Sequence, residues 1–250
     1  MLVVANWKMN GLRRESIDRA KTLAQMESTN RLKCDVLLCP PAQILSDIRY
    51  AIDNSNIFLG AQDCHFDFEG PYTGDISSSM LVDVGCTHVI IGHSERRINH
   101  SETNEIVARK AEAAHQVGLN TIICIGENME EFKLGQTVEK LSNQLANSIP
   151  DSANLNNTMI AYEPCWAIGS GSTPTLTEID DTHKAILEFI KKNIFKQGEK
   201  MDILYGGSVN EKNADSILDL DHVGGVLVGG ASLITEKFWS ICKSADRKFK

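Results

Sequence analysis

Short runs of aliphatic and β-branched residues recur along the chain, and polar residues or glycine bound each of them. Such a run is too short for an independent helix, and its unbroken apolarity is typical of a strand buried on both faces of a parallel sheet. The pattern predicts eight strands, at residues 2–6, 35–39, 57–61, 88–92, 121–126, 159–163, 202–206 and 225–229.

Segments with helical spacing or composition lie between these runs. Thr177 and Glu178 resemble the acidic first turn of a helix, and Gly118 stands where a helix is expected to stop. The clearest predicted helices occupy residues 15–26, 102–118, 130–149 and 177–194.

The alternation of strand and helix, repeated eight times without a linker or low-complexity tract, predicts an α/β fold. We expect a closed (β/α)8 barrel that forms one domain over residues 1–250; an open doubly wound sheet is the structural alternative. In a barrel, the residues just after each strand share one face, where active sites lie.

Composition and charge narrow the possible functions. The 250 residues are 42% apolar and carry a formal net charge of −8, which argues against a binder of nucleic acid or anionic membrane, because both need a cationic surface. The first residues lack a basic flank and a cleavage pattern, and no apolar run nears the ~18 residues that span a bilayer. We therefore expect a soluble, cytoplasmic protein.

Seven cysteines include no C-x-x-C pair, and the histidines and cysteines show no metal-ligand spacing. The sequence thus predicts neither a disulfide framework nor a metal site. Most of the cysteines are expected to be small buried apolar residues.

Ionisable side chains follow several predicted strands. Lys8 and His93 come just after two of them, Glu127 follows a third, and Glu163 ends the run at 159–163 before Pro164 breaks it. Far apart in sequence, these groups are expected to meet at the mouth of the barrel. The plain alternatives are a surface lysine, a hydrogen-bonded structural histidine and exposed loop acids.

Each of these groups also fits a chemical role. Lys8 could be an anion clamp or an imine-forming amine. A helical turn beginning at Ser94 would disfavour the charged form of His93, whose neutral ring could then donate a hydrogen bond to a carbonyl oxygen. An apolar neighbourhood from Trp166 and Ile168 would give Glu163 a pKa suited to general-base work near neutrality.

Glycine pairs follow the last two predicted strands, at 206–207 and 229–230. None of the glycine groups is a G-x-G-x-x-G or P-loop motif, so nucleotide binding is poorly supported. Loops in these two positions of a barrel frequently present backbone N–H groups to phosphate, although isolated glycine pairs are usually turns.

Five motifs, in order and at these separations, make the chain resemble the triosephosphate isomerase family along essentially its whole length. They are ANWKMN, IIGHSERR, AYEPCWAIGSG, ILYGGSV and VLVGGASL. The resemblance implies a barrel enzyme of glycolysis and gluconeogenesis that interconverts dihydroxyacetone phosphate and D-glyceraldehyde 3-phosphate through an enediolate, without a cofactor, as a homodimer.

The resemblance also implies roles for individual residues. Glu163 is expected to be the base, His93 the neutral electrophile, and Lys8 the cation that stabilises the enediolate and the phosphate. A lid built from residues 164–171 is expected to close over the site. The residues expected to bind substrate are Asn6, Lys8, Gly169, Ser208, Gly229 and Gly230. Those expected to support the site are Glu95 and Cys124.

Two features concern the surroundings of this site. The long segment 62–76 matches a family loop that inserts into the neighbouring subunit, with Thr73 near the other active site; a mobile surface loop is the alternative. Cys165 stands where the family usually has valine, and we expect its modification to hinder the lid.

Two other functions remain open at this point. A lysine-dependent aldolase on the same barrel would form an imine at Lys8. A non-catalytic phosphosugar sensor would bind the same anion and turn nothing over.

Overall fold

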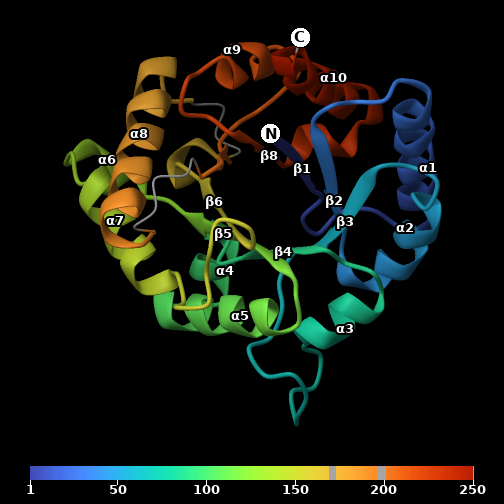
Figure 1. The fold of residues 1–250 in the computed structure, drawn as a ribbon, viewed down its shortest axis with the longest axis horizontal. Helices are drawn as coiled ribbons and strands as arrows, with labels where there is room; N and C mark the ends of the chain where they lie inside the picture. The colour runs from blue at the N-terminus through green and yellow to red at the C-terminus, as the bar shows by residue number, and fades with distance from the viewer. Residues whose placement is uncertain (169–172, 196–200, 250) are drawn as a thin grey trace.

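Eight parallel strands close into a barrel in which consecutive strands are neighbours and β8 pairs with β1 (Figure 1). The computed structural model describes residues 1–168, 173–195 and 201–249. The predicted (β/α)8 architecture is therefore confirmed, and the open doubly wound sheet was wrong. The strands are β1 (Leu2–Asn6), β2 (Asp35–Cys39), β3 (Ile57–Ala61), β4 (His88–Ile91), β5 (Asn120–Ile125), β6 (Thr158–Tyr162), β7 (Ile203–Tyr205) and β8 (Gly225–Val228).

The first three strands have the bounds predicted from the apolar runs, and most of the later ones end a residue early. Glu163 is one such case: it follows β6 instead of ending it, although its amide still donates to the carbonyl of Ile125 at 2.8 Å. The strand ladder thus fixes the main chain of Glu163 while its side chain is free of the sheet.

Helices surround the barrel as an outer ring (Figure 1). The α-helices are α1 (Arg13–Thr29), α2 (Leu45–Ala51), α3 (Ser78–Asp83), α4 (Ser94–Asn99), α5 (Asn104–Gln116), α6 (Met129–Lys133), α7 (Thr137–Ser148), α8 (Leu176–Asn193), α9 (Ala214–Leu218) and α10 (Thr235–Asp246). Short 3-10 turns are η1 (Ala42–Ile44), η2 (Cys165–Ala167), η3 (Gly230–Leu233) and η4 (Arg247–Phe249).

All four predicted helices differ in their bounds from those observed, and two of these differences have an identifiable cause. The single helix expected over 130–149 is broken into α6 and α7 by Gly135, whose φ of 70° is a left-handed conformation that glycine adopts without strain. The helix expected from 177 begins at Leu176, because Thr175 caps it in a reciprocal capping box with Glu178.

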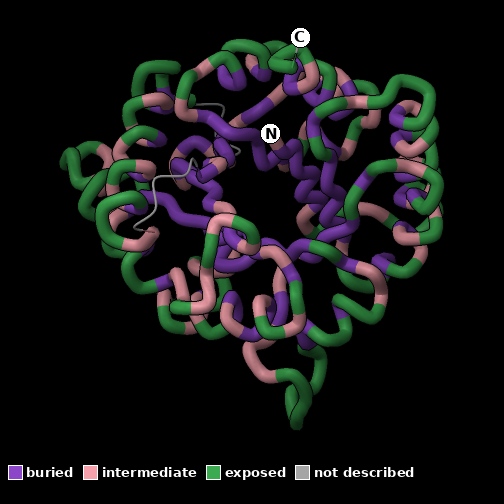
Figure 2. Tube along the Cα trace, in the orientation of Figure 1, coloured by how far each residue is buried: buried purple, intermediate pink, exposed green. Residues whose placement is uncertain are grey.

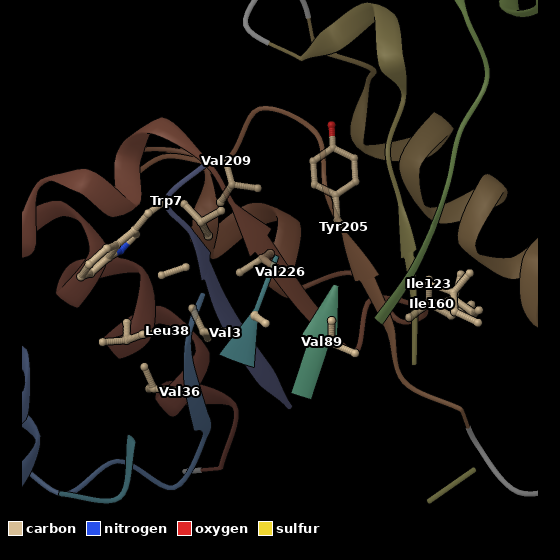
Figure 3. Packing of buried hydrophobic residues seen from close by; sticks show 14 of the residues in the cluster. Val3, Trp7, Val36, Leu38, Val89, Ile123, Ile160, Tyr205, Val209 and Val226 are labelled. Atoms are coloured by element: carbon tan, nitrogen blue, oxygen red, sulfur yellow. The ribbon is translucent and has the colours of Figure 1, made fainter. Parts of the chain in front are cut away.

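Alternate residues of most strands enter two different cores. One set fills the inside of the barrel, with Val4, Leu37 and Ile90 among its members. The other set points outward against the helices, as Figure 3 shows for Val3 and Val36, so that the strands are buried on both faces (Figure 2). This explains why the strands read as unbroken apolar runs rather than as alternating ones.

The connection between β3 and α3 projects outward from the ring of helices (Figure 1). Its base is closed by the amide of His65, which donates to the carbonyl of Ile76 at 2.8 Å, and Thr73 is exposed near its tip. No helix in the part of the chain that the structure describes is both long and apolar enough to cross a membrane.

Candidate active site

A cavity of about 240 Å³ lies at the carboxyl ends of the strands, on the face where barrel active sites are found. It is lined by every residue expected to react with or bind substrate that the structure describes: Asn6, Lys8, His93, Glu163, Ser208, Gly229 and Gly230. Gly169 lies outside the described residues. The loops of β1, β4, β6, β7 and β8 therefore meet as the sequence predicted.

Lys8 is held in an unusual backbone conformation, with φ at 51°. The side-chain oxygen of Asn6 accepts from its amide at 3.0 Å, and Gln62 Nε2 donates to its carbonyl at 2.9 Å. Its Nζ lies 2.5 Å from Glu95 Oε1. Glu95 therefore contacts Lys8 without itself lining the cavity, and its supporting role stays a prediction.

His93 caps the N-terminus of α4. Its Nδ1 accepts a hydrogen bond from the amide of Glu95 at 3.2 Å, so this nitrogen carries no proton. The ring proton is therefore on Nε2, which faces the cavity and lies 2.8 Å from Glu163 Oε1. The neutral form of His93 stays a prediction, and the hydrogen bond at Nδ1 is the geometry that this form requires.

Glu163 is only 1% exposed, and its Oε2 accepts from the amide of Ser94 at 2.9 Å. Burial by itself would raise the pKa of this carboxyl, but the contact with His93, the Ser94 amide and the charge of Lys8 together lower it below its usual range. The expectation that apolar surroundings would tune this pKa was therefore wrong for this arrangement, because polar groups contact the carboxylate and lower its pKa.

Of the two apolar residues expected beside Glu163, only Ile168 lines the cavity. Trp166 turns away and donates from its indole nitrogen to Glu127 Oε1 at 2.8 Å. Tyr162 donates to the same oxygen at 3.1 Å, and burial raises the pKa of Glu127. The position of Glu127 after a strand could be predicted from the sequence, but its hydrogen-bond partners could not.

The glycine loops leave open backbone at the bottom of the cavity. A side chain at Gly229 would begin 3.2 Å from Lys8 Cε, and one at Gly230 would meet no atom within 4 Å. Ser208 lines the same cavity, and its hydroxyl donates to the carbonyl of Ala167 at 2.6 Å. Backbone amides in loops of this kind are donors that can bind phosphate. Phosphate could therefore approach these amides closely.

A second cavity of about 160 Å³ lies behind Glu163 and is lined by Cys124 and Cys165, among others. Burial raises the pKa of the Cys165 thiol to about 12, so little thiolate exists near neutral pH. The predicted sensitivity of Cys165 to modification stays a prediction, and the reaction is expected to be slow.

Metal ligation finds no support at this site. Within residues 1–168, 173–195 and 201–249, no three His, Cys, Asp or Glu side chains come together in a way that could hold an ion. The charges of the cavity are instead supplied by Lys8 and Glu163.

Comparison with known proteins gives one consistent match. The family model described as "Triosephosphate isomerase" matches residues 1–245. The triosephosphate isomerase of Rhizobium meliloti is 44% identical over 98% of this chain and 96% of its own, and that of Bartonella bacilliformis is 45% identical over 96% and 95%. The crystal structure of triosephosphate isomerase from Bartonella henselae superposes with a TM-score of 0.89 at 42% identity, covering 97% of this chain and 98% of the other.

Proposed function

The chain belongs to the triosephosphate isomerase family and interconverts dihydroxyacetone phosphate and D-glyceraldehyde 3-phosphate, and we propose that it does so in the cavity at the mouth of the barrel. The observation that carries this assignment is the meeting of Lys8, His93 and Glu163 around a floor of open glycine backbone. These groups can move a proton between two carbons of a phosphorylated triose.

We propose that the phosphate of the substrate is the main binding group and that the amides of Ser208, Gly229 and Gly230 hold it. The formal net charge of −8 opposes an anionic substrate, so its affinity must come from such local donors and from Lys8. Gly169 is proposed as a further amide donor.

The proton transfer itself needs a base and an oxyanion site. Glu163 takes the proton from the carbon beside the carbonyl, and the electron pair moves to the carbonyl oxygen to give an enediolate. The Nε2–H of His93 and the ammonium of Lys8 stabilise that oxygen, while Asn6 fixes its position. Glu163 then returns the proton to the other carbon, and His93 moves the proton between the oxygens; no cofactor enters the scheme.

Glu163 must leave the Ser94 amide before it can act, because both of its oxygens point at α4 and His93 in the ligand-free arrangement. Release from those partners also removes two of the groups that lower its pKa, and a neighbouring substrate excludes water. Its basicity therefore rises when it is needed.

The aldolase alternative finds little support in this geometry. Imine formation needs a free amine, whereas the Nζ of Lys8 lies 2.5 Å from a carboxylate oxygen of Glu95. The pair instead suits a fixed positive charge at the edge of the cavity.

An isomerase assay on D-glyceraldehyde 3-phosphate tests the proposed function. We expect steady turnover that a phosphate-bearing mimic of the enediolate inhibits competitively, because the mimic would occupy the amide floor and the oxyanion site together. A protein that binds the mimic but shows no turnover would be a sensor instead of an enzyme.

We also propose a homodimer formed through the projecting loop of residues 62–76. Phe68 and Tyr72 of this loop are 40% and 39% exposed, and Met9, next to Lys8, is 97% exposed. Exposed apolar side chains of this kind are typical of a protein–protein contact. Thr73 is then the residue expected to approach the partner's site; a monomer in gel filtration at micromolar concentration would contradict this arrangement.

Location and domain organisation follow from the same assignment. The family match runs over residues 1–245, which supports one catalytic domain spanning residues 1–250. We propose that it acts in the cytoplasm, where the phosphorylated trioses of glycolysis and gluconeogenesis are found.

A further inference from the structure

The indole of Trp166 is held on two sides by one short stretch of chain. Its nitrogen donates to Glu127 at 2.8 Å, and its ring lies against the ring of Phe132, with centroids 4.5 Å apart and planes inclined at 32°. Both partners come from the loop after β5 and the helix α6. A close pair of aromatic rings contributes energy beyond that of simple burial.

The stretch that carries these partners is itself firmly anchored. Asn128 caps α6 in a reciprocal capping box with Glu131, and Glu131 forms an ion pair with Lys140 of α7 at 2.7 Å. Phe132 is half-buried on the last turn of α6. The ring of Phe132 therefore lies on a helix, α6, that is capped at its N-terminus and joined to α7 by an ion pair.

The same stretch also reaches the main chain beside the base. The amide of Cys165 donates to the carbonyl of Glu127 at 3.0 Å. Trp166 stands in the turn η2, which begins two residues after Glu163. The position of this turn and the direction of the Glu163 carboxylate are thus coupled through Pro164 and Cys165.

We propose that Phe132 is a positioning residue for the isomerisation: its contact with Trp166 stabilises the arrangement of η2 in which Glu163 rests on the Ser94 amide. The inference builds on the proposed role of Glu163 as the base. Phe132 touches neither substrate nor base, and it acts by setting how readily the turn lets the base move.

Phe132→Ala tests this through ligand affinity. Because the contact stabilises only the resting arrangement, its loss is expected to make a phosphate-bearing enediolate mimic bind about two- to tenfold more tightly. Phe132→Tyr keeps the ring and is expected to match the parent, and Lys133→Ala, an exposed neighbour on the same helix, serves as the control. Phe132→Leu replaces the alanine variant if the latter does not fold, with the same expected result.

Acrylamide quenching of tryptophan fluorescence in the ligand-free protein gives a readout that needs no activity. Trp7 and Trp239 are 0% and 8% exposed, so quenching reports mainly Trp166. Phe132→Ala is expected to increase quenching, and Phe132→Tyr to leave it unchanged.

Unchanged mimic affinity, or weaker binding, in a folded Phe132→Ala variant would overturn the proposal, as would unchanged quenching. A parent protein that shows no isomerase activity at all would instead overturn the proposed function, whatever the quenching result.

Discussion

Replacement of Glu163 by glutamine is expected to lower kcat by about 10²- to 10⁴-fold, the range attributed to a positioned general base. Glutamine has nearly the same shape and can still contact the Ser94 amide, but it cannot accept the carbon proton. The measurement is steady-state turnover of D-glyceraldehyde 3-phosphate in a coupled assay. Because the substitution removes a group needed in the transition state, KM is expected to change far less than kcat.

The pH profile gives a second view of the same carboxylate. Since the pKa of Glu163 in the ligand-free enzyme is lowered, its carboxylate stays ionised through the neutral range. We therefore expect kcat/KM to fall through protonation of Glu163 only at acid pH. The same shift stabilises the fold above the unfolded-state pKa of the group, and that stabilisation is lost as the pH falls through the lowered value. If the Glu163→Gln variant kept the kcat of the parent, Glu163 could not be the base.

Lys8→Met is expected to reduce kcat/KM by about 10²- to 10³-fold, in line with the loss of one donor to a developing oxyanion. Methionine has a similar length and fits the same space, so the change removes the positive charge and leaves the shape of the cavity. Lys8 is the one lysine or arginine among the described residues that line this cavity. We expect a lower kcat and a higher KM, because the enediolate and the phosphate are both anionic.

Glu95→Gln provides the matched control for that variant. It keeps the ammonium of Lys8 but weakens the contact at 2.5 Å that orients it, so a smaller loss is expected. Thermal unfolding separates these effects from misfolding. Activity of Lys8→Met within a few-fold of the parent would show that backbone amides alone supply the anion site.

The barrel was predictable from the sequence because strands that are buried on both faces have unbroken apolar runs. The ends of the helices were harder to predict from the sequence. Gly135 could equally have been tolerated inside a helix, and the start of α8 depended on the capping box that Thr175 forms with Glu178. Such choices are settled by three-dimensional packing.

The site shows the same division. The meeting of Lys8, His93 and Glu163 followed from barrel topology, since residues after parallel strands share one face. The sign of the Glu163 pKa shift could not follow, because it depends on which way the side chain turns. The partnership of Trp166 with Glu127 and Phe132 likewise depends on rotamers that no spacing rule encodes.

The pairing of β1 with β8 joins the first strand of the chain to the last, with Leu2 opposite Gly225. During synthesis on the ribosome, β1 therefore has an open edge until the final strand has been made, and partial barrels carry unpaired N–H and C=O groups throughout this interval. Closure then removes both edges in one step. The newborn chain, rather than the finished enzyme, is the form in which this fold is most exposed to strand pairing with another molecule.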